Sequence, residues 1–154
     1  MIRLTFVSHL AAKRERVWDT VARTRGVNDE LSPLVRMTFP REVDRLDLSN
    51  PVVRRGFDSW VLLFGLLPMD RHRFGFVDII DGESFDERSH SWLHRSWRHQ
   101  RMVTEGASSS SSNVRDELTI EPRLRILVPV IRIGVSAVFR HRHARLRQRF
   151  GQAS

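Results

Sequence analysis

The sequence predicts an α+β fold in which an antiparallel sheet packs against one long C-terminal helix, and three observations lead to this prediction. Residues 2–6 alternate between apolar and polar side chains, as a half-buried strand does. Residues 71–120 contain further runs with the same period of two, separated by turn signals such as Asp81-Gly82. Residues 121–150 have the length and pattern of a single helix.

Short helices are expected between the first strand and the second. Residues 11–24 carry apolar side chains at helical spacing, and Gly26 is expected to end that helix. A further helical turn is expected at residues 28–31, before Pro33. Residues 35–39 alternate as a second strand that ends at Pro40, and the polar residues 41–56 are expected to form a loop.

Residues 59–68 are continuously apolar but too few to span a bilayer. We expect a short helix that packs over an open side of the sheet, although a buried strand has the same composition. A second interpretation stays open, because Gly65 and Pro68 would let residues 59–67 move as a lid. Such a lid would touch an anionic membrane transiently during ligand exchange, with Arg54 and Arg55 facing the lipid. A core helix is favoured over the lid.

After Pro68 we expect strands at residues 71–80, 85–91, 94–104 and 114–120. On the first of these, the residues at even positions from His72 to Ile80 are expected to share one face. The serine-rich residues 106–113 are expected to form a hairpin loop centred near Ser108 and Ser109. The pairs predicted across this hairpin are Trp97–Ile120, His99–Leu118, Arg101–Asp116 and Val103–Val114. Because this register matches apolar with apolar and acid with base, we assign these residues to the inner face, and the even positions from His94 to Met102 to the outer face.

The long C-terminal helix is expected to be buried at one end and half solvated at the other. Residues 126–139 are apolar on almost every side, so we expect them to be covered over most of the helix circumference. A membrane span is disfavoured because the run is short and contains Arg132. Downstream, Phe139, Leu146 and Phe150 continue one apolar stripe, while arginines occupy the other faces.

Composition limits the functional classes. The chain of 154 residues, 40% of them hydrophobic, suits one domain spanning residues 1–154. It has no cysteine, which excludes disulfides, thiolate nucleophiles and cysteine-ligated metals. Since no signal-peptide pattern is visible at the N-terminus, we expect a cytoplasmic protein. The net charge of +8 raises nucleic acid as a partner, but recognition motifs are absent and the tryptophans lie in segments predicted to be buried. Nucleic-acid binding is therefore disfavoured.

Several stretches of the sequence resemble those of a known family: FVSHLAA at 6–12 with VW at 17–18, LLPMDRH at 66–72, ERS at 87–89 with WRHQR at 97–101, and FRHRH at 139–143. The family to which they are similar is that of the bacterial SRPBCC proteins, in the START-like, helix-grip superfamily. The resemblance implies a curved antiparallel sheet wrapped around the long C-terminal helix. It also implies a cavity between them for a hydrophobic or amphipathic small molecule, such as a lipid, a polyketide or an aromatic compound. The superfamily includes lipid carriers, plant hormone receptors and aromatic polyketide cyclases, but none of their catalytic motifs can be placed on this sequence residue by residue.

The candidate site residues come from the faces of the predicted strands and helix. The ligand-binding candidates are Phe74, Phe76, Glu87, Ser89, Trp97, His99, Arg101, Asp116, Leu118, Ile131 and Val135. Among them, Glu87, His99, Arg101 and Asp116 are also catalytic candidates for a cyclase or dehydratase, in which a base abstracts a proton from a carbon acid and the arginine holds the resulting oxyanion. Three interpretations stay open: a structural ion-pair network, ligand binding, and catalysis. The structural interpretation is favoured.

We predict neither a metal nor a cofactor. His141 and His143 diverge by roughly 200° around a helix, so they cannot chelate one ion from that helix. Glycine-rich phosphate loops and serine nucleophile elbows are absent from the sequence.

Overall fold

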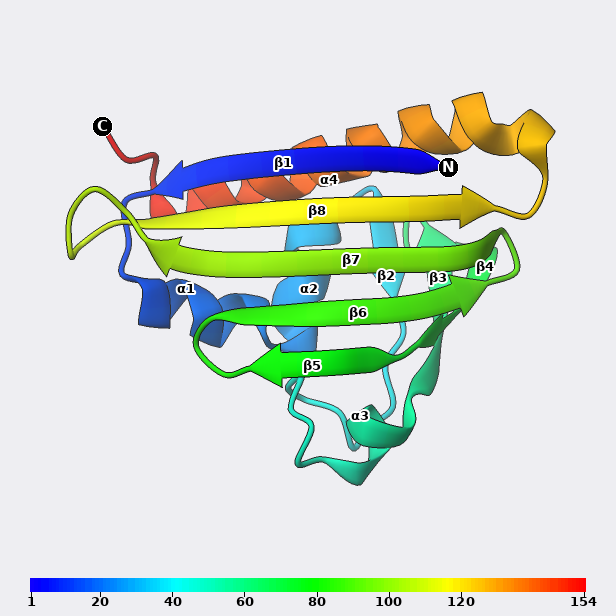
Figure 1. The fold of residues 1–154 in the computed structure, drawn as a ribbon, viewed down its shortest axis with the longest axis horizontal. Coiled ribbons are helices and arrows are strands. Elements are labelled where there is room, and N and C mark those ends of the chain that lie inside the picture. The colour runs from blue at the N-terminus through cyan, green and yellow to red at the C-terminus, as the bar shows by residue number, and fades with distance from the viewer.

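The computed structural model describes residues 1–154 and consists of an eight-stranded sheet with helices against one face (Figure 1). The strands are β1 (Ile2–Leu10), β2 (Val35–Met37), β3 (Phe57–Leu63), β4 (Leu67–Phe74), β5 (Phe76–Ile80), β6 (Ser84–Ser91), β7 (His94–Glu105) and β8 (Ser112–Pro122). The helices are α1 (Arg14–Val21), α2 (Thr24–Leu31), α3 (Pro51–Arg55), the 3₁₀ turn η1 (Arg125–Leu127) and α4 (Val128–Phe150).

The sheet is antiparallel, with strand order β1-β8-β7-β6-β4-β3-β2 and with β5 paired to β6. The long helix α4 lies along β1 and contacts both β1 and α2 (Figure 1). This arrangement confirms the predicted α+β class, a curved antiparallel sheet around a long C-terminal helix with short helices after the first strand.

The predicted hairpin register is confirmed. Strands β7 and β8 pair Trp97 with Ile120, His99 with Leu118, Arg101 with Asp116 and Val103 with Val114. Seven of these eight side chains are buried, and Trp97 is half-buried. The long hairpin therefore places its polar residues beneath α4.

The prediction of a helix at residues 59–68 is wrong. These residues form the end of β3, a turn in which Phe64 and Gly65 have positive φ angles of 53° and 74°, and the start of β4. Pairing with β2 on one side and β4 on the other fixes β3 as a strand. A continuous apolar run has no period that could distinguish these alternatives, and Phe64, Leu66 and Leu67 at the turn are exposed rather than part of the core. The lid that the sequence left open at residues 59–67 would therefore be the tip of the β3–β4 hairpin.

The single strand predicted at residues 71–80 is interrupted at Gly75. A Cβ at Gly75 would lie 2.8 Å from the carbonyl oxygen of Arg88, so only glycine permits this close approach of the chain to β6. The pairing of β5 with β6 is also irregular between Phe76 and Asp78. As a result Asp78 and Ile80 are exposed and do not share the buried face of Phe74.

Two smaller predictions, about the end of the first helix and about the loop at residues 41–56, are also wrong. Gly26 lies inside α2 rather than ending the preceding helix, and a Cβ there would lie 1.9 Å from the carbonyl oxygen of Thr20. Residues 41–56 contain the short helix α3, whose first turn is capped by the side chain of Asn50, which accepts a hydrogen bond from Val52 N–H at 2.9 Å.

The two halves of α4, residues 128–137 and 138–150, differ from the prediction in opposite ways. In the first half one side packs on the sheet through Ile131, whereas Val130 and Ile133 are exposed. In the second half the buried stripe of Phe139, Leu146 and Phe150 is confirmed, and two further buried residues, Arg142 and His143, lie among the expected solvated faces. No helix combines the length and apolarity needed to cross a bilayer.

Candidate functional site

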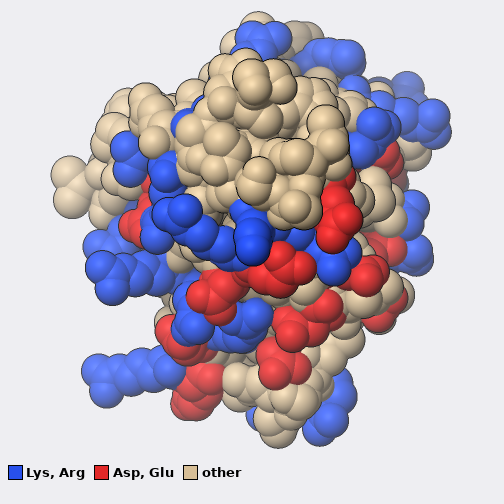
Figure 2. Space-filling view, turned by 90° about the vertical axis from the view of Figure 1, so that its left-hand side faces the viewer, with Lys and Arg blue, Asp and Glu red and all other residues tan.

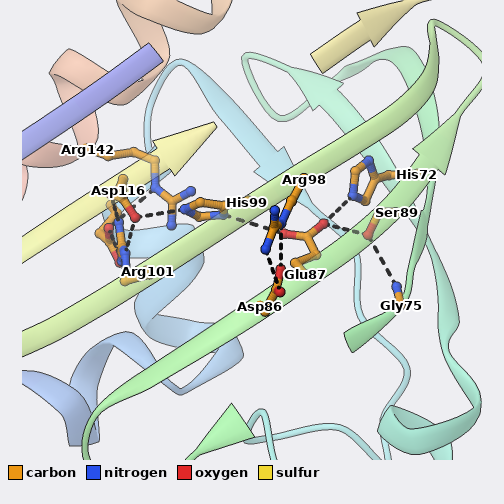
Figure 3. Close-up of polar contacts among 11 residues, drawn as sticks. His72, Gly75, Asp86, Glu87, Ser89, Arg98, His99, Arg101, Asp116 and Arg142 are labelled. Atoms are coloured by element: carbon orange, nitrogen blue, oxygen red, sulfur yellow. Dashed lines mark hydrogen bonds and ion pairs between the residues drawn. The ribbon is translucent and has the colours of Figure 1, made fainter. Parts of the chain in front are cut away.

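A buried network of charged side chains is centred on Arg101, which has no exposed surface (Figure 3). Its Nε and one terminal nitrogen donate to the two carboxylate oxygens of Asp116, both at 2.7 Å. The other terminal nitrogen donates to Glu30 of α2 at 2.8 Å and 3.0 Å. Because the Arg101 guanidinium is paired and hydrogen-bonded with two carboxylates, its charge can be buried in the core.

The network continues along the sheet from Asp116 to β6 and β4. His99 Nε2 lies 2.7 Å from Asp116 Oδ1, and its Nδ1 lies 3.5 Å from Glu87 Oε2. Nε2 therefore donates to the acceptor-only carboxylate of Asp116, and Nδ1 faces a second carboxylate at the longer distance. Glu87 also receives hydrogen bonds from His72 at 2.7 Å and Ser89 at 2.6 Å. Figure 3 shows this line of contacts between β7, β6 and β4.

The second half of α4 adds Arg142 to the network. Its Nε donates to Glu30 at 3.3 Å, and its guanidinium lies over the ring of Phe139 at 4.9 Å. Burial lowers the pKa of Arg142 from its ordinary value, and the ion pair with Glu30 opposes that shift. Two buried arginines, Arg101 and Arg142, therefore pair with the buried carboxylates Glu30 and Asp116.

His143 links Asp116 to the edge strand β1. Its Nε2 lies 2.8 Å from Asp116 Oδ2, and its Nδ1 lies 2.6 Å from Ser8 Oγ. Arg147 donates to Ser8 Oγ at 2.9 Å. Because the Asp116 carboxylate only accepts, His143 donates from Nε2, and the Ser8 hydroxyl has its own proton to donate to the unprotonated Nδ1. All three contacts therefore fit a single tautomer.

The pKa values of the network follow from burial opposed by pairing. Burial raises the pKa of Glu87, but hydrogen bonds from His72 and His99 outweigh it and lower that pKa from 4.5 to about 2. Burial acts in the same direction on Asp116, and its ion pair with Arg101 holds the pKa of that carboxyl well below its usual range. The carboxylates are therefore ionised at neutral pH.

The predicted site residues fall into three groups in the structure. Glu87, Ser89, His99, Arg101 and Asp116 lie in the network. Phe74 and Phe76 stack on each other with ring centroids 5.8 Å apart, next to the network. Trp97, Leu118, Ile131 and Val135 belong to an apolar cluster between α4 and the sheet. Their roles in ligand binding or catalysis stay predictions, and no three His, Asp or Glu side chains are arranged to hold a metal ion.

Sequence reasoning missed four members of the network: Glu30, His72, Arg142 and His143. His72 had a usable signal, because it shares the inner face of β4 with Phe74. Glu30 and Arg142 had none, since their partners lie 71 or more residues away in the sequence.

His94 is a further residue that the alternation misplaced. It was assigned to the outer face of its strand, but it is only 7% exposed. A register shift between His94 and Ser96 turns it inward. Its ring contacts Trp97 at 5.2 Å between centroids, and Trp97 in turn contacts His72 at 5.7 Å. Three aromatic side chains therefore meet at this end of β7.

The Nε2 atom of His94 is buried and has no hydrogen-bond partner. Ser91 Oγ accepts the backbone N–H groups of Leu93 and His94, at 3.2 Å and 3.0 Å, and the Leu93 N–H is shared with Asp70 Oδ1, also at 3.2 Å. These incoming N–H groups leave the Ser91 hydroxyl proton to donate to Nδ1 of His94, 3.0 Å away, which fits the tautomer with the ring proton on Nε2. Burial lowers the pKa of His94, against the opposing charge of Asp70, so the ring is neutral at pH 7. The result is a buried donor that lacks an acceptor.

The two main cavities lie elsewhere, on the outside of the helices. Their volumes are about 450 Å³ and 470 Å³, and both are lined by Thr20, Gly26, Asp29 and Arg149. They are polar, and Leu146 is the one apolar side chain in their walls. They are therefore not the apolar cavity between helix and sheet that the resemblance implies.

Figure 2 shows the end of the molecule where α1 and the C-terminus lie, and basic and acidic side chains are interspersed there. Arg23 pairs with Asp19 at 3.2 Å, and Arg45 pairs with Asp19 at 2.7 Å and with Asp81 at 3.1 Å. The net charge of +8 therefore does not form a continuous basic face at this end.

Solved structures with the same architecture cover nearly the whole chain. CV1439 from Chromobacterium violaceum is 12% identical with a TM-score of 0.72 over 98% of both chains. A START superfamily protein from Mycobacterium smegmatis is 8% identical with a TM-score of 0.66 over 96% of both chains. DynU16, described as a putative protein in the dynemicin biosynthetic locus, is 10% identical with a TM-score of 0.59 over 98% of this chain and 49% of its own.

These similarities establish the START-like, helix-grip fold. A comparison with curated proteins finds no match. A family described as a domain of unknown function (DUF8410) matches residues 8–150, which is most of the chain. The protein therefore belongs to the DUF8410 family and has the START-like fold.

Proposed function

We propose that the protein binds a small amphipathic molecule between the first half of α4 and the strands beneath it. The observation that carries this proposal is the buried Nε2 of His94, which has no hydrogen-bond partner and lies beside the half-buried Trp97. An unpaired buried donor costs about 1–3 kcal/mol, and an acceptor oxygen on a ligand recovers that free energy. The likeness to a START superfamily protein supports a ligand-binding role for this fold.

The apolar part of the ligand would lie against side chains that the protein leaves incompletely covered. Trp97, Leu127, Val128 and Val135 are half-buried around the core formed by Ile131 and its neighbours. Covering their remaining surface would contribute roughly 25 cal/mol per Å² of apolar area. A ligand with an alkyl or aromatic body and one oxygen acceptor fits both requirements.

The buried network fits a supporting role better than a reacting one. Glu87, His99, Arg101 and Asp116 are all hydrogen-bonded within the protein, and none has an unpaired charge directed at the proposed ligand position. A cyclase or dehydratase would need one of these groups to leave its partners. Their pairing therefore favours binding over that chemistry.

Lauric acid, which combines an alkyl chain with a carboxylate acceptor, is a suitable probe. In ¹⁵N-labelled protein its addition should shift the indole N–H signal of Trp97. His94→Phe keeps an aromatic ring but removes the donor, and it should weaken laurate binding about tenfold in calorimetry. His90→Phe changes an exposed histidine on β6 and should leave the affinity unchanged. An unmoved Trp97 signal, or equal losses in both variants, would refute the proposal.

A further inference from the structure

An exposed apolar stripe runs along the outward side of η1 and the first half of α4 and consists of Ile126, Val130 and Ile133, with the exposed Leu124 immediately before them. The exposed fractions of Leu124, Ile126, Val130 and Ile133 are 59%, 84%, 68% and 71%. The last three follow a spacing of four and then three residues, so they lie on one side of the helix. Contiguous exposed apolar surface of this kind on a protein marks an interaction site.

The segment that carries the stripe has no acidic residue. From residue 122 to residue 154 the chain contains eight arginines and no aspartate or glutamate. Among these arginines only Arg142 and Arg149 form ion pairs, so Arg125 and Arg132, next to the stripe, are free of acidic partners. Both free arginines are exposed.

The free arginines border the stripe. Arg125 immediately precedes Ile126 and Arg132 immediately precedes Ile133, so both side chains leave the helix on the same flank of the stripe. Long arginine stems extend along apolar surface and hold their charge at its edge. An apolar strip with cationic edges is the pattern of a helix that lies in the interface of an anionic bilayer.

We infer that η1 and the first half of α4 dock on an anionic phospholipid surface. Val130 and Ile133 enter the boundary between headgroups and acyl chains, and Arg125 and Arg132 contact lipid phosphates. A second copy of the chain fits the stripe less well, because a symmetric contact would bring these arginines against one another. This contact differs from the one predicted at residues 59–67, and it does not depend on the proposed ligand.

Flotation of the full chain with lipid vesicles tests the inference. Vesicles with equal parts of phosphatidylglycerol and phosphatidylcholine should bind the protein at low salt, and pure phosphatidylcholine should bind it far more weakly. Arg125→Gln with Arg132→Gln should lower the affinity for anionic vesicles roughly 30-fold. Val130→Ser with Ile133→Ser should reduce binding to both kinds of vesicle.

Matched controls use side chains on other faces. Val77→Ser with Ile80→Ser alters two apolar residues of β5 that are 56% and 47% exposed, and Arg54→Gln with Arg55→Gln removes two exposed arginines of α3. Both control variants should bind like the unmodified protein. Absence of anionic-vesicle binding, or equal losses in the controls, overturns the inference. A dimer in sedimentation that Val130→Ser with Ile133→Ser dissociates, without vesicle binding, would also overturn it and assign the stripe to self-association.

Discussion

The first half of α4 is apolar in sequence and leaves one side in solvent, whereas the second half is rich in arginine and histidine and buries two of them. Val130 and Ile133 face solvent because no other element covers them. Arg142 and His143, in contrast, contact Glu30 and Asp116 in the core. Whether a side chain of this helix is buried thus depends on the groups of other elements that face it, and not only on the polarity of the side chain itself. Charged side chains enter a core when their partners arrive from other elements.

The largest expected effect comes from breaking the network beneath the second half. Arg101→Met leaves Asp116 and Glu30 buried without their main countercharge, and we expect a loss of about 3–5 kcal/mol in the free energy of unfolding. Arg98→Met is the matched control, because Arg98 pairs with Asp86 near the surface and its loss should cost less than about 1 kcal/mol. Urea denaturation measures both. If Arg101→Met lowered the free energy of unfolding as little as Arg98→Met is expected to, the network would not stabilise the fold.

A second contrast compares apolar residues from the two halves. Phe139→Ala removes a buried ring that contacts Phe6, Trp97 and His99, and we expect a loss of about 3–5 kcal/mol. Ile133→Ala should change the free energy of unfolding by no more than about 0.5 kcal/mol, because that side chain is exposed. Thermal or urea unfolding of the two variants gives the comparison. A large loss from Ile133→Ala would show that the first half is packed more tightly than described.

The third prediction concerns acid. Because the pKa of Glu87 is about 2 in the folded protein and 4.5 ordinarily, its ionised form stabilises the fold above pH 4.5. That contribution, on the order of 3 kcal/mol, is lost as the pH falls from 4.5 towards 2. Urea denaturation at a series of pH values should show this decline, and Glu87→Gln should make it shallower. An unchanged slope in Glu87→Gln would assign the acid sensitivity to other carboxylates.

The smallest expected effect is a change in the first half that stability measurements barely detect. Val130→Ser with Ile133→Ser should leave the thermal midpoint close to that of the unmodified protein, although it reduces vesicle binding. Circular dichroism during heating provides the measurement. A large fall in the midpoint would show that the stripe packs against the protein itself.

The hairpin and its inner face could be predicted because the information is local. Alternation identifies the faces of β7 and β8, and the opposition of Arg101 to Asp116 fixes their register. The same reasoning failed at His94, since one irregular step at the start of a strand reverses the face without changing the composition.

The rest of the network and the exposed stripe could not be predicted, for a different reason. Glu30 contacts Arg101 only because α2 packs against the inside of the sheet. No sequence pattern near Glu30 indicates that contact. For α4, an apolar surface indicates which residues favour burial but not whether another element is present to cover them.

The contact of Arg101 with Asp116 and Glu30 also constrains how sequences of the DUF8410 family can diverge. Replacing any one of the three leaves a charge in the core without compensation, whereas replacing all three with apolar residues of similar volume can preserve stability. Positions 30, 101 and 116 should therefore change together between relatives, as a coupled set drawn from a helix and two strands. An aligned set of family sequences in which an aliphatic residue stands at position 101 should lack acidic residues at both other positions.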